Sequence, residues 1–290
     1  SPGASGNICC NVKALSVKEV FAVTVIGNDW RGEILQQELK KSEICLDHMI
    51  VSPRMVTSTY IKPILCGWDS QQEDSRLDFT NHNPLPQTLE DHLIKNIRLV
   101  VPKVDAVIIE DQMVQNGIIT DNVRESLIQL ANENRERIFV ADSRARIGLF
   151  RSMVLKPNRV EAVRAICRSK NPKEVEMDEL TEIGVELQKL ASRPIYITLS
   201  EKGALLVTEL GQHHLPAAPT EPPIDPVGAG DTFISAIGAS LAGVADPIEA
   251  GIVANLAAGV VVKKLNITGT ASPEEILRKF EEAASLQEWP

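Results

Sequence analysis

Segments with the length and apolar content of buried strands alternate with segments of helical periodicity along most of this chain, and this alternation constrains the fold more than any other feature. Buried strands are predicted at 104–111 and 137–144, with a helix over 120–135 between them. Residues 152–166 continue the pattern as strand, turn and helix. Since consecutive parallel strands need crossover helices, we predict a doubly wound, mostly parallel α/β sheet with helices on both faces.

The two ends of the chain extend this pattern. Near the N-terminus we predict a helix over 6–15, a strand over 19–29 and a helix over 32–42. Toward the C-terminus the predicted elements are a helix at 178–192, two strands around a glycine turn within 194–210, and helices at 231–242, 247–264 and 273–285. Residues 1–44 and 88–290 are therefore assigned to one α/β core.

One segment interrupts the core pattern. Residues 48–79 are rich in Val, Ile, Thr and Tyr, are broken by Pro53 and Pro63, and show no helical period. We assign 45–87 to a small antiparallel β lid inserted into the core, and expect it to cover an active site. The alternative is an edge hairpin used only for packing or dimerisation.

Charge and cysteine content limit the classes of partner and compartment. The formal net charge is −9, which argues against a general nucleic-acid or anionic membrane surface. No apolar stretch approaches the roughly 20 residues of a membrane span. The five cysteines are odd in number and lack metal-ligand spacing. We therefore expect reduced, largely buried thiols in a cytoplasmic protein with no nucleic-acid or membrane partner.

A glycine-rich turn, "DPVGAGD" (225–231), precedes a strongly apolar helix. Gly228 and Gly230 allow a sharp turn that leaves backbone amides exposed, and the N-terminus of an anchored helix attracts anions. Asp231 then has two interpretations. It is a helix cap or first-turn acid, or it is a base that works beside a bound phosphate.

The turn differs from two common phosphate motifs. No Lys-Ser or Lys-Thr follows the second glycine, as a Walker motif requires, and the third glycine of the dinucleotide fingerprint is absent. An acid beside a phosphate is unfavourable for binding alone. It is useful when a hydroxyl must lose a proton as it attacks phosphorus.

Two further turns follow predicted strands. In "KPNRVE" (156–161), Asn158 and Glu161 have the ligand chemistry for hydrated Mg²⁺, or they form a capping box at a helix start. In "TLSEKG" (198–203), Thr198 and Ser200 face nucleotide phosphates, or Gly203 simply makes a hairpin. Both alternatives stay open at this point.

Basic residues gather between these turns. Arg144, Arg146, Arg151 and Lys156 form either a solvated face or a receiving site for a phosphorylated substrate. Arg76, in the predicted lid, is another candidate for that site.

Taken in order, these stretches resemble the PfkB/ribokinase family of sugar kinases over nearly the full chain. The carriers are "PGASGN" (2–7), "VIGNDWRG" (25–32), "KPNRVE", "TLSEKGALLV", "DPVGAGDTF" and "ANLAAGVVVKKLNITGTASPEE". "DPVGAGDTF" is similar to the family's C-terminal signature and is highly specific. Within the family, the lid sequence, Ser200 and the tail "AAGVVVKKLNITGTASP" resemble the heptose-7-phosphate kinase/ADP-heptose synthase branch.

The resemblance implies a ribokinase-like kinase that uses ATP and Mg²⁺ to phosphorylate a sugar hydroxyl. It makes Asp231 the catalytic base, with Mg²⁺ organised by Asn158 and Glu161 through water. The other implied roles are an anion hole (Gly228, Ala229, Gly230), an ATP site (Thr198, Ser200, Gly203, Asn255) and sugar contacts (Gly3, Asn7). It also suggests a homodimer formed through the lid, and it leaves a requirement for a monovalent cation open.

Three features depart from the family pattern. Members begin with a strand and a substrate-binding acid upstream of the glycine-rich "PGASGN", so we expect an N-terminal strand to be missing from this sequence. Ala4 replaces one of the paired glycines that approach the sugar. Residues 108–117 also differ from the corresponding loop of heptose kinases.

We therefore expect a sugar or sugar-phosphate kinase, heptose-phosphate-like in its acceptor, with Arg76 and Arg144 at the substrate. The alternatives are a neutral-sugar kinase of the fructokinase or ribokinase kind, and a pseudokinase that binds nucleotide or sugar without turnover. The intact Asp231, Asn158 and Glu161 oppose the last alternative, and the departures above favour it.

Overall fold

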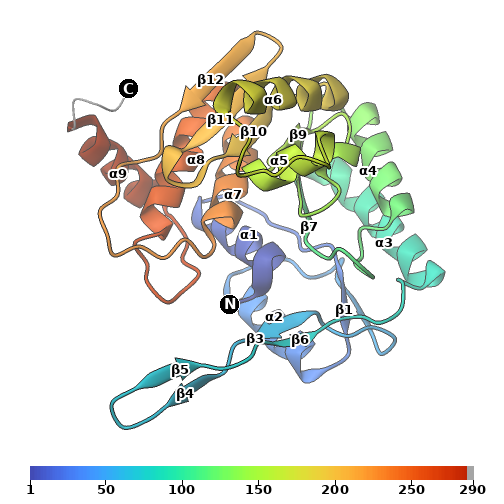
Figure 1. Cartoon of the computed structure of the whole chain (residues 1–290). Helices are drawn as coiled ribbons and strands as arrows, with labels where there is room; N and C mark the ends of the chain where they lie inside the picture. The colour runs from blue at the N-terminus through green and yellow to red at the C-terminus, as the bar shows by residue number, and fades with distance from the viewer. Residues whose placement is uncertain (286–290) are drawn as a thin grey trace.

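A six-stranded sheet lies at the centre of the computed structural model, which describes residues 1–285 (Figure 1). Its strand order is β12-β11-β10-β9-β8-β7. Four strands are parallel: β7 (Ala106–Asp111), β8 (Ile138–Ser143), β9 (Val154–Leu155) and β10 (Ile195–Thr198). Two strands, β11 (Ala204–Thr208) and β12 (Gly211–Leu215), add antiparallel to β10. The prediction of a mostly parallel sheet is confirmed.

Helices cover both faces of this sheet, as predicted. One face packs against α3 (Gln87–Val100), α4 (Asp121–Glu133), α5 (Arg159–Ile166) and α6 (Met177–Ala191). The other packs against α1 (Gly3–Ala14), α7 (Ala229–Ala242), α8 (Pro247–Val261) and α9 (Pro273–Ser285). Strand residues alternate between the two cores: Phe139 and Ala141 enter the first, and Val140 enters the second.

The predicted strand over 19–29 is shorter in the structure. Only β1 (Val25–Gly27) is a strand, and it pairs in parallel with β2 (Ile50–Ser52) as a separate two-stranded sheet. Phe21 makes one isolated bridge with Cys45. The apolar run is buried in two places: Ala22 packs with Leu39 of α2 (Trp30–Lys41) in a small core, and Val25 joins the large core beneath the main sheet. The apolar composition of this segment therefore reflects burial by packing and not hydrogen-bonded pairing in a long strand.

The lid consists of two short antiparallel ribbons. β3 (Thr59–Ile61) pairs with β6 (Leu77–Phe79), and β4 (Ile64–Cys66) pairs with β5 (Gln71–Glu73). Together they project from the body as a narrow arm (Figure 1). β2 lies beside β1 and not in this arm, so the projecting part begins after it.

Two smaller expectations are also answered. The cysteines are free and four of them are mostly buried, so the prediction of largely buried thiols fails only for Cys66, which is exposed in the lid. Short strands such as β4 expose both faces when nothing packs on them.

None of the helices within residues 1–285 combines the length and the apolar character needed to cross a membrane.

Candidate active site

The floor of the site is a row of charged side chains at the carboxyl ends of three neighbouring strands. Glu110 on β7 lies opposite Asp142 on β8 in the parallel register. Lys156 follows β9, one position beyond the Ala141–Leu155 pair. The residues two positions earlier on each strand are apolar and pack toward α7. The face of the sheet that carries α7 therefore ends in three ionisable groups.

This row is buried and only partly satisfied. The Lys156 Nζ atom lies 2.7 Å from Asp142 Oδ2, and the two residues are 4% and 6% exposed. The other Asp142 oxygen, Oδ1, has no hydrogen-bond partner among the described residues, and neither has either carboxylate oxygen of Glu110. Buried polar atoms are usually paired, so these orphaned acceptors indicate a place where a ligand or water belongs.

Asp231 stands above this row in the first turn of α7. The helix begins after Gly228, whose φ of +85° suits glycine, and no side chain caps it. The Asp231 carboxylate instead accepts a 2.8 Å hydrogen bond from Asn7 Nδ2 on α1. The carboxylate makes no bond to the helix's own amides, so Asp231 is a first-turn acid and not a cap, and its role as a base stays a prediction.

The glycine turn presents a cationic environment. The Ala229 amide donates to the Pro226 carbonyl oxygen at 3.1 Å, while the Gly228 and Gly230 amides have no hydrogen-bond partner within residues 1–285. Lys156 Nζ lies 3.7 Å from the point that a Cβ on Gly230 would occupy. Free amides, a helix N-terminus and a buried ammonium group thus converge, and together they suit an anion.

Burial makes the carboxyl groups around Lys156 harder to ionise. It raises the pKa of Asp231, although Asn7 and the Lys156 charge act in the opposite direction. Burial is the main reason why the pKa of Glu110 lies well above its usual range, and the nearby charges of Asp142 and Asp231 raise it further. The pKa of Glu161 is raised mainly by burial as well. One lysine therefore offsets the charge of several crowded acids.

We expect Glu110→Gln to stabilise the protein at pH 8 but not at pH 5. Because the pKa of Glu110 is raised in the folded state, wild type loses stability as the pH rises through that pKa. Glutamine stays neutral, so the gain should reach roughly 1–2 kcal/mol, the scale of an unsatisfied buried group. Urea unfolding at both pH values measures it. Equal stability of the two proteins at pH 8 would mean that the Glu110 carboxylate is satisfied.

Asn158 and Glu161 form a capping box at the start of α5. Asn158 Oδ1 accepts from the Glu161 amide at 2.9 Å, and Glu161 Oε2 accepts from the Asn158 amide at 2.8 Å. No cluster of three or more metal-ligating side chains occurs in the described chain. One carboxylate and one amide oxygen do suit Mg²⁺ that arrives on a nucleotide and keeps most of its waters. The capping role is confirmed, and the Mg²⁺ role stays a prediction.

Three of the residues predicted for ATP lie at the end of β10 or on the turn between β10 and β11, and the fourth lies on α8. The Thr198 amide donates to the Pro157 carbonyl at 2.9 Å, which joins this turn to Asn158. Ser200 is exposed and begins a short 3₁₀ turn, and Gly203 closes it with φ +84°. Asn255 on α8 is buried, and its amide donates to the Leu215 and Pro216 carbonyls at 3.0 Å each. Gly203 and Asn255 thus have structural roles; nucleotide contact stays a prediction for all four.

The residues predicted for the sugar are only partly brought together. Asn7 bonds Asp231 directly, and Gly3 begins the same helix with φ +75° and open space around it. Arg144 is exposed just beyond β8. Arg76 lies on the lid, where both of its bonds to Asp78, at 2.6 and 2.8 Å, stay within the same ribbon.

The basic run between the turns separates into different roles. Arg146 is held by the Asp111 carboxylate and the Met113 carbonyl, and Arg151 donates to the Gly148 and Phe150 carbonyls. These two arginines stabilise loops, whereas Lys156 enters the site. Glu110 and Asp142 belong to no motif and were not predicted as site residues. A usable signal existed, since each is an acid at the carboxyl end of a predicted buried strand.

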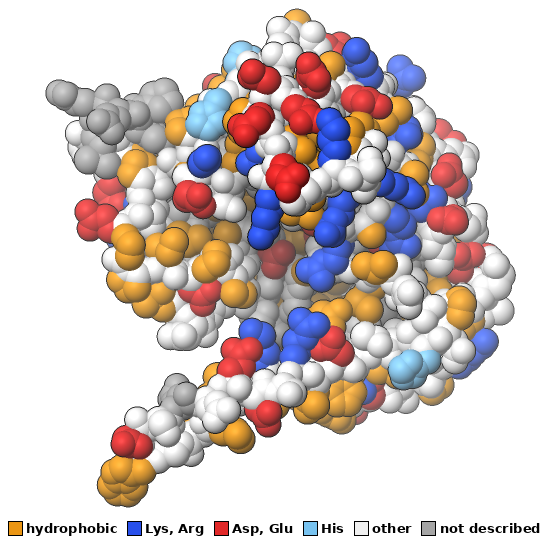
Figure 2. Space-filling view, viewed as in Figure 1, with side chains coloured by type: hydrophobic (Ala, Val, Ile, Leu, Met, Phe, Trp, Pro, Cys, Tyr) orange, Lys and Arg blue, Asp and Glu red, His pale blue; other side chains and the backbone are white. Residues whose placement is uncertain are grey.

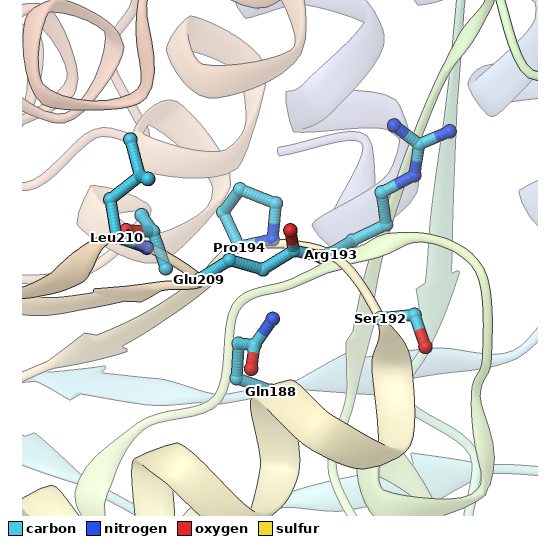
Figure 3. Close-up of a pocket in the computed structure, with 7 residues that line it drawn as sticks. Gln188, Ser192, Arg193, Pro194, Glu209 and Leu210 are labelled. Carbon is cyan, nitrogen blue, oxygen red and sulfur yellow. Dashed lines mark hydrogen bonds between the residues drawn. The ribbon is translucent and has the colours of Figure 1, made fainter.

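The surface shows where ligands have access. A hollow separates the lid arm from the body, and Lys and Arg side chains gather along its walls (Figure 2). A second, shallow pocket of about 250 Å³ lies at the opposite, amino-terminal end of β10 (Figure 3). There Arg193 turns its guanidinium away to the Arg135 carbonyl. The orphaned acceptors and free amides lie at the carboxyl edge, so we place the site there.

Comparison with protein families gives one match across the chain. The model of the pfkB family of carbohydrate kinases matches residues 2–275. Among curated proteins, the bifunctional protein HldE of Bradyrhizobium sp. (strain ORS 278) is 29% identical over 280 residues, which cover 96% of this chain and 55% of that protein. HldE of Helicobacter hepaticus is 27% identical, with 99% and 58% covered. The chain thus spans little more than half the length of these relatives.

Solved structures share the fold at low identity. Ribokinase of Arabidopsis thaliana, complexed with ribose and ATP, superposes with a TM-score of 0.70 at 17% identity, covering 96% of this chain and 87% of that one. Phosphofructokinase-2 of Escherichia coli, in complex with potassium, gives 0.75 at 16% identity, with 96% and 86% covered. These likenesses confirm the ribokinase-like fold predicted from the sequence.

Proposed function

The chain belongs to the pfkB family of carbohydrate kinases, and we propose that it transfers the γ-phosphoryl group of ATP to a hydroxyl of a sugar or sugar phosphate. The observation that carries the proposal is the position of Asp231. Its carboxylate is free of any capping bond, is fixed by Asn7, and stands at the first turn of a glycine-rich helix beside the Lys156 ammonium.

The proposed reaction is a direct, in-line transfer without a covalent enzyme intermediate. Asp231 accepts the proton of the acceptor hydroxyl as its oxygen bonds to the γ-phosphorus and the bond to the β-phosphate oxygen breaks, releasing ADP. The unpaired Gly228 and Gly230 amides stabilise the charge on the transferring group. Asn158 and Glu161 would hold Mg²⁺, which neutralises phosphate charge when it is bound with the nucleotide.

A phosphorylated, heptose-like acceptor is the first candidate for the sugar. The basic walls of the hollow favour an anionic acceptor on a chain whose net charge is −9 (Figure 2). The HldE relatives belong to the heptose kinase branch that the sequence resembles. The orphaned oxygens of Glu110 favour the second candidate, a neutral sugar, because they would accept hydrogen bonds from sugar hydroxyls.

ADP release across matched pairs of sugars and their phosphates decides between these candidates. Each pair, including a heptose and its 7-phosphate, is tested with Mg·ATP, with and without potassium. Turnover confined to phosphorylated acceptors supports the first candidate, and turnover confined to neutral sugars replaces it with the second. Binding of Mg·ATP without ADP release from any acceptor would favour the pseudokinase alternative.

We also propose that two copies associate through the lid. The arm exposes a run of large apolar side chains, with Ile64, Leu65 and Trp68 at 57%, 54% and 104% exposure. A lone two-stranded ribbon is marginally stable in water, and a continuous apolar surface usually meets a partner.

Leu65→Glu should therefore weaken self-association by at least about tenfold, the scale of one lost apolar anchor. Analytical ultracentrifugation over a concentration series measures this. Val244→Glu is the matched control, because Val244 is 92% exposed but lies on the body, between α7 and α8. A wild-type protein that stays monomeric throughout, or a control that dissociates equally, would contradict the lid interface.

A further inference from the structure

The ion pair between Asp142 and Lys156 is costly to bury and incompletely satisfied. Both residues are almost fully buried, yet Asp142 bonds through one oxygen only, and its Oδ1 has no partner in the described chain. Buried ion pairs retained for structure are normally completed by further hydrogen bonds, and a neutral pair of similar size is often as stable. The neighbouring Asp111–Arg146 pair shows the completed form, since Ser143 and the Met113 carbonyl bond to it as well.

The Lys156 ammonium has N–H donors that Asp142 does not use, and the ammonium lies beside the glycine turn. An ammonium group carries three N–H donors, and Asp142 is the acceptor that the described residues supply to Lys156. The same ammonium lies 3.7 Å from the position of a Cβ on Gly230, beside the unpaired amides. A glycine there leaves open the space through which a ligand oxygen can reach both the amide and the ammonium.

Strand register sets the direction of the lysine. Lys156 leaves β9 with its amide bonded to the Ala141 carbonyl at 3.0 Å, so its side chain rises next to Asp142 on the adjacent strand. Asp142 in turn is flanked by Glu110 on β7. Both carboxylates lie on the β8 and β7 side of the lysine and attract its ammonium group in that direction, and the 2.7 Å bond to Asp142 fixes the ammonium at one point.

We propose, resting on the kinase function proposed above, that Lys156 binds the transferring γ-phosphoryl group and that Asp142 is the residue that positions it. Lys156 then distinguishes ATP from ADP, because the group it contacts exists only in ATP. Asp142 touches no substrate; it holds the ammonium in line with the Gly230 amide. Neither residue caps a helix or contributes to the apolar cores.

Nucleotide binding tests the role of Lys156 without requiring turnover. Calorimetry gives the affinities of wild type for the non-hydrolysable Mg·ATP analogue with an imido bridge and for Mg·ADP. Lys156→Met should lower the preference for the triphosphate by about tenfold or more and reduce kcat by about 10²–10³, the usual effect of losing one transition-state donor. Lys279→Met is the matched control, because Lys279 is a largely buried lysine paired with Glu282 on α9. It should change neither quantity.

The role of Asp142 is tested by a split between kcat and KM. Asp142→Asn keeps the size and one acceptor, so we expect triphosphate affinity to stay within about threefold while kcat falls by about tenfold or more. Asp142→Glu should recover part of kcat by restoring the charge. If Lys156→Met leaves Asp142 unpaired and unfolds, the double variant Asp142→Asn/Lys156→Met removes both charges, and its triphosphate preference is measured instead.

The outcomes distinguish failure of the roles assigned to Lys156 and Asp142 from failure of the proposed kinase function. A folded Lys156→Met or double variant that keeps the wild-type preference for the triphosphate would overturn the assignment of Lys156. Loss of kcat in Asp142→Asn in step with a lowered melting temperature would reduce Asp142 to a structural residue. A wild-type protein that binds neither nucleotide would instead contradict the kinase function itself.

Discussion

Asp231→Asn is expected to lower kcat by about 10²–10⁴-fold, the usual contribution of a general base. The fold should not suffer, because the carboxylate caps nothing and an asparagine oxygen still accepts the Asn7 hydrogen bond. Stability should stay equal or rise slightly, since the variant removes a charge whose burial raises the pKa of Asp231. Steady-state kinetics, thermal unfolding and nucleotide titration check the three parts of this expectation.

Asp246 provides the control for an acid at a helix start. It caps α8 through bonds to the Ile248 and Glu249 amides at 2.7 and 2.9 Å. Asp246→Ala should therefore cost about 0.5–2 kcal/mol of stability and leave kcat unchanged. If Asp231→Asn behaved like Asp246→Ala, unstable but active, the assignment of Asp231 as the base would be wrong.

Gly203→Ala is expected to destabilise the protein by roughly 2–5 kcal/mol, from backbone strain and overpacking combined. Gly203 has φ +84°, and a Cβ there would overlap the Leu215 carbonyl oxygen and come within 2.5 Å of the Ala217 nitrogen. These atoms belong to backbone, which cannot move aside as a flexible side chain does. Denaturant unfolding measures the loss.

A glycine at the next turn, between β11 and β12, is the matched control. Gly211 also has a positive φ, +147°, but nothing lies within 4 Å of a Cβ built on it. Gly211→Ala should cost only the backbone strain, about 1–3 kcal/mol. A Gly203→Ala variant that folds as well as wild type but fails to bind ATP would show that nucleotide contact, and not chain geometry, requires this glycine.

Much of the fold followed from local pattern. The helices over 121–133 and 273–285 and the strands over 106–111 and 138–143 lie within or close to the predicted ranges, because apolar periodicity reports directly which face is buried. The prediction of a strand over 19–29 was wrong for most of its length, because apolar residues indicate burial and not the element that buries them. Val25 is buried in the large core and Ala22 packs in a small core with Leu39 of α2, and composition alone does not distinguish such packing from pairing in a long strand.

The site was predictable only where a motif is continuous in sequence. The glycine turn and Asp231 lie within seven residues of one another (225–231), so local chemistry suggested an anion and a base. The bond between Asn7 and Asp231 joins residues 224 positions apart. Only the family resemblance predicted that Asn7 lies at the substrate. Glu110, Asp142 and Lys156 become neighbours only through strand register, which a single sequence does not specify.

Direct observation of the phosphorus atoms tests most directly whether this chain transfers the γ-phosphoryl group of ATP to a sugar hydroxyl. Phosphorus NMR of the wild-type chain with Mg·ATP and an accepted sugar or sugar phosphate should show the γ-phosphate signal of ATP replaced by that of a new phosphate ester, in step with ADP. The same sample with Asp231→Asn should show almost no ester over the same period. ATP that stays intact while bound to the wild-type protein, across neutral and phosphorylated acceptors alike, would contradict the account.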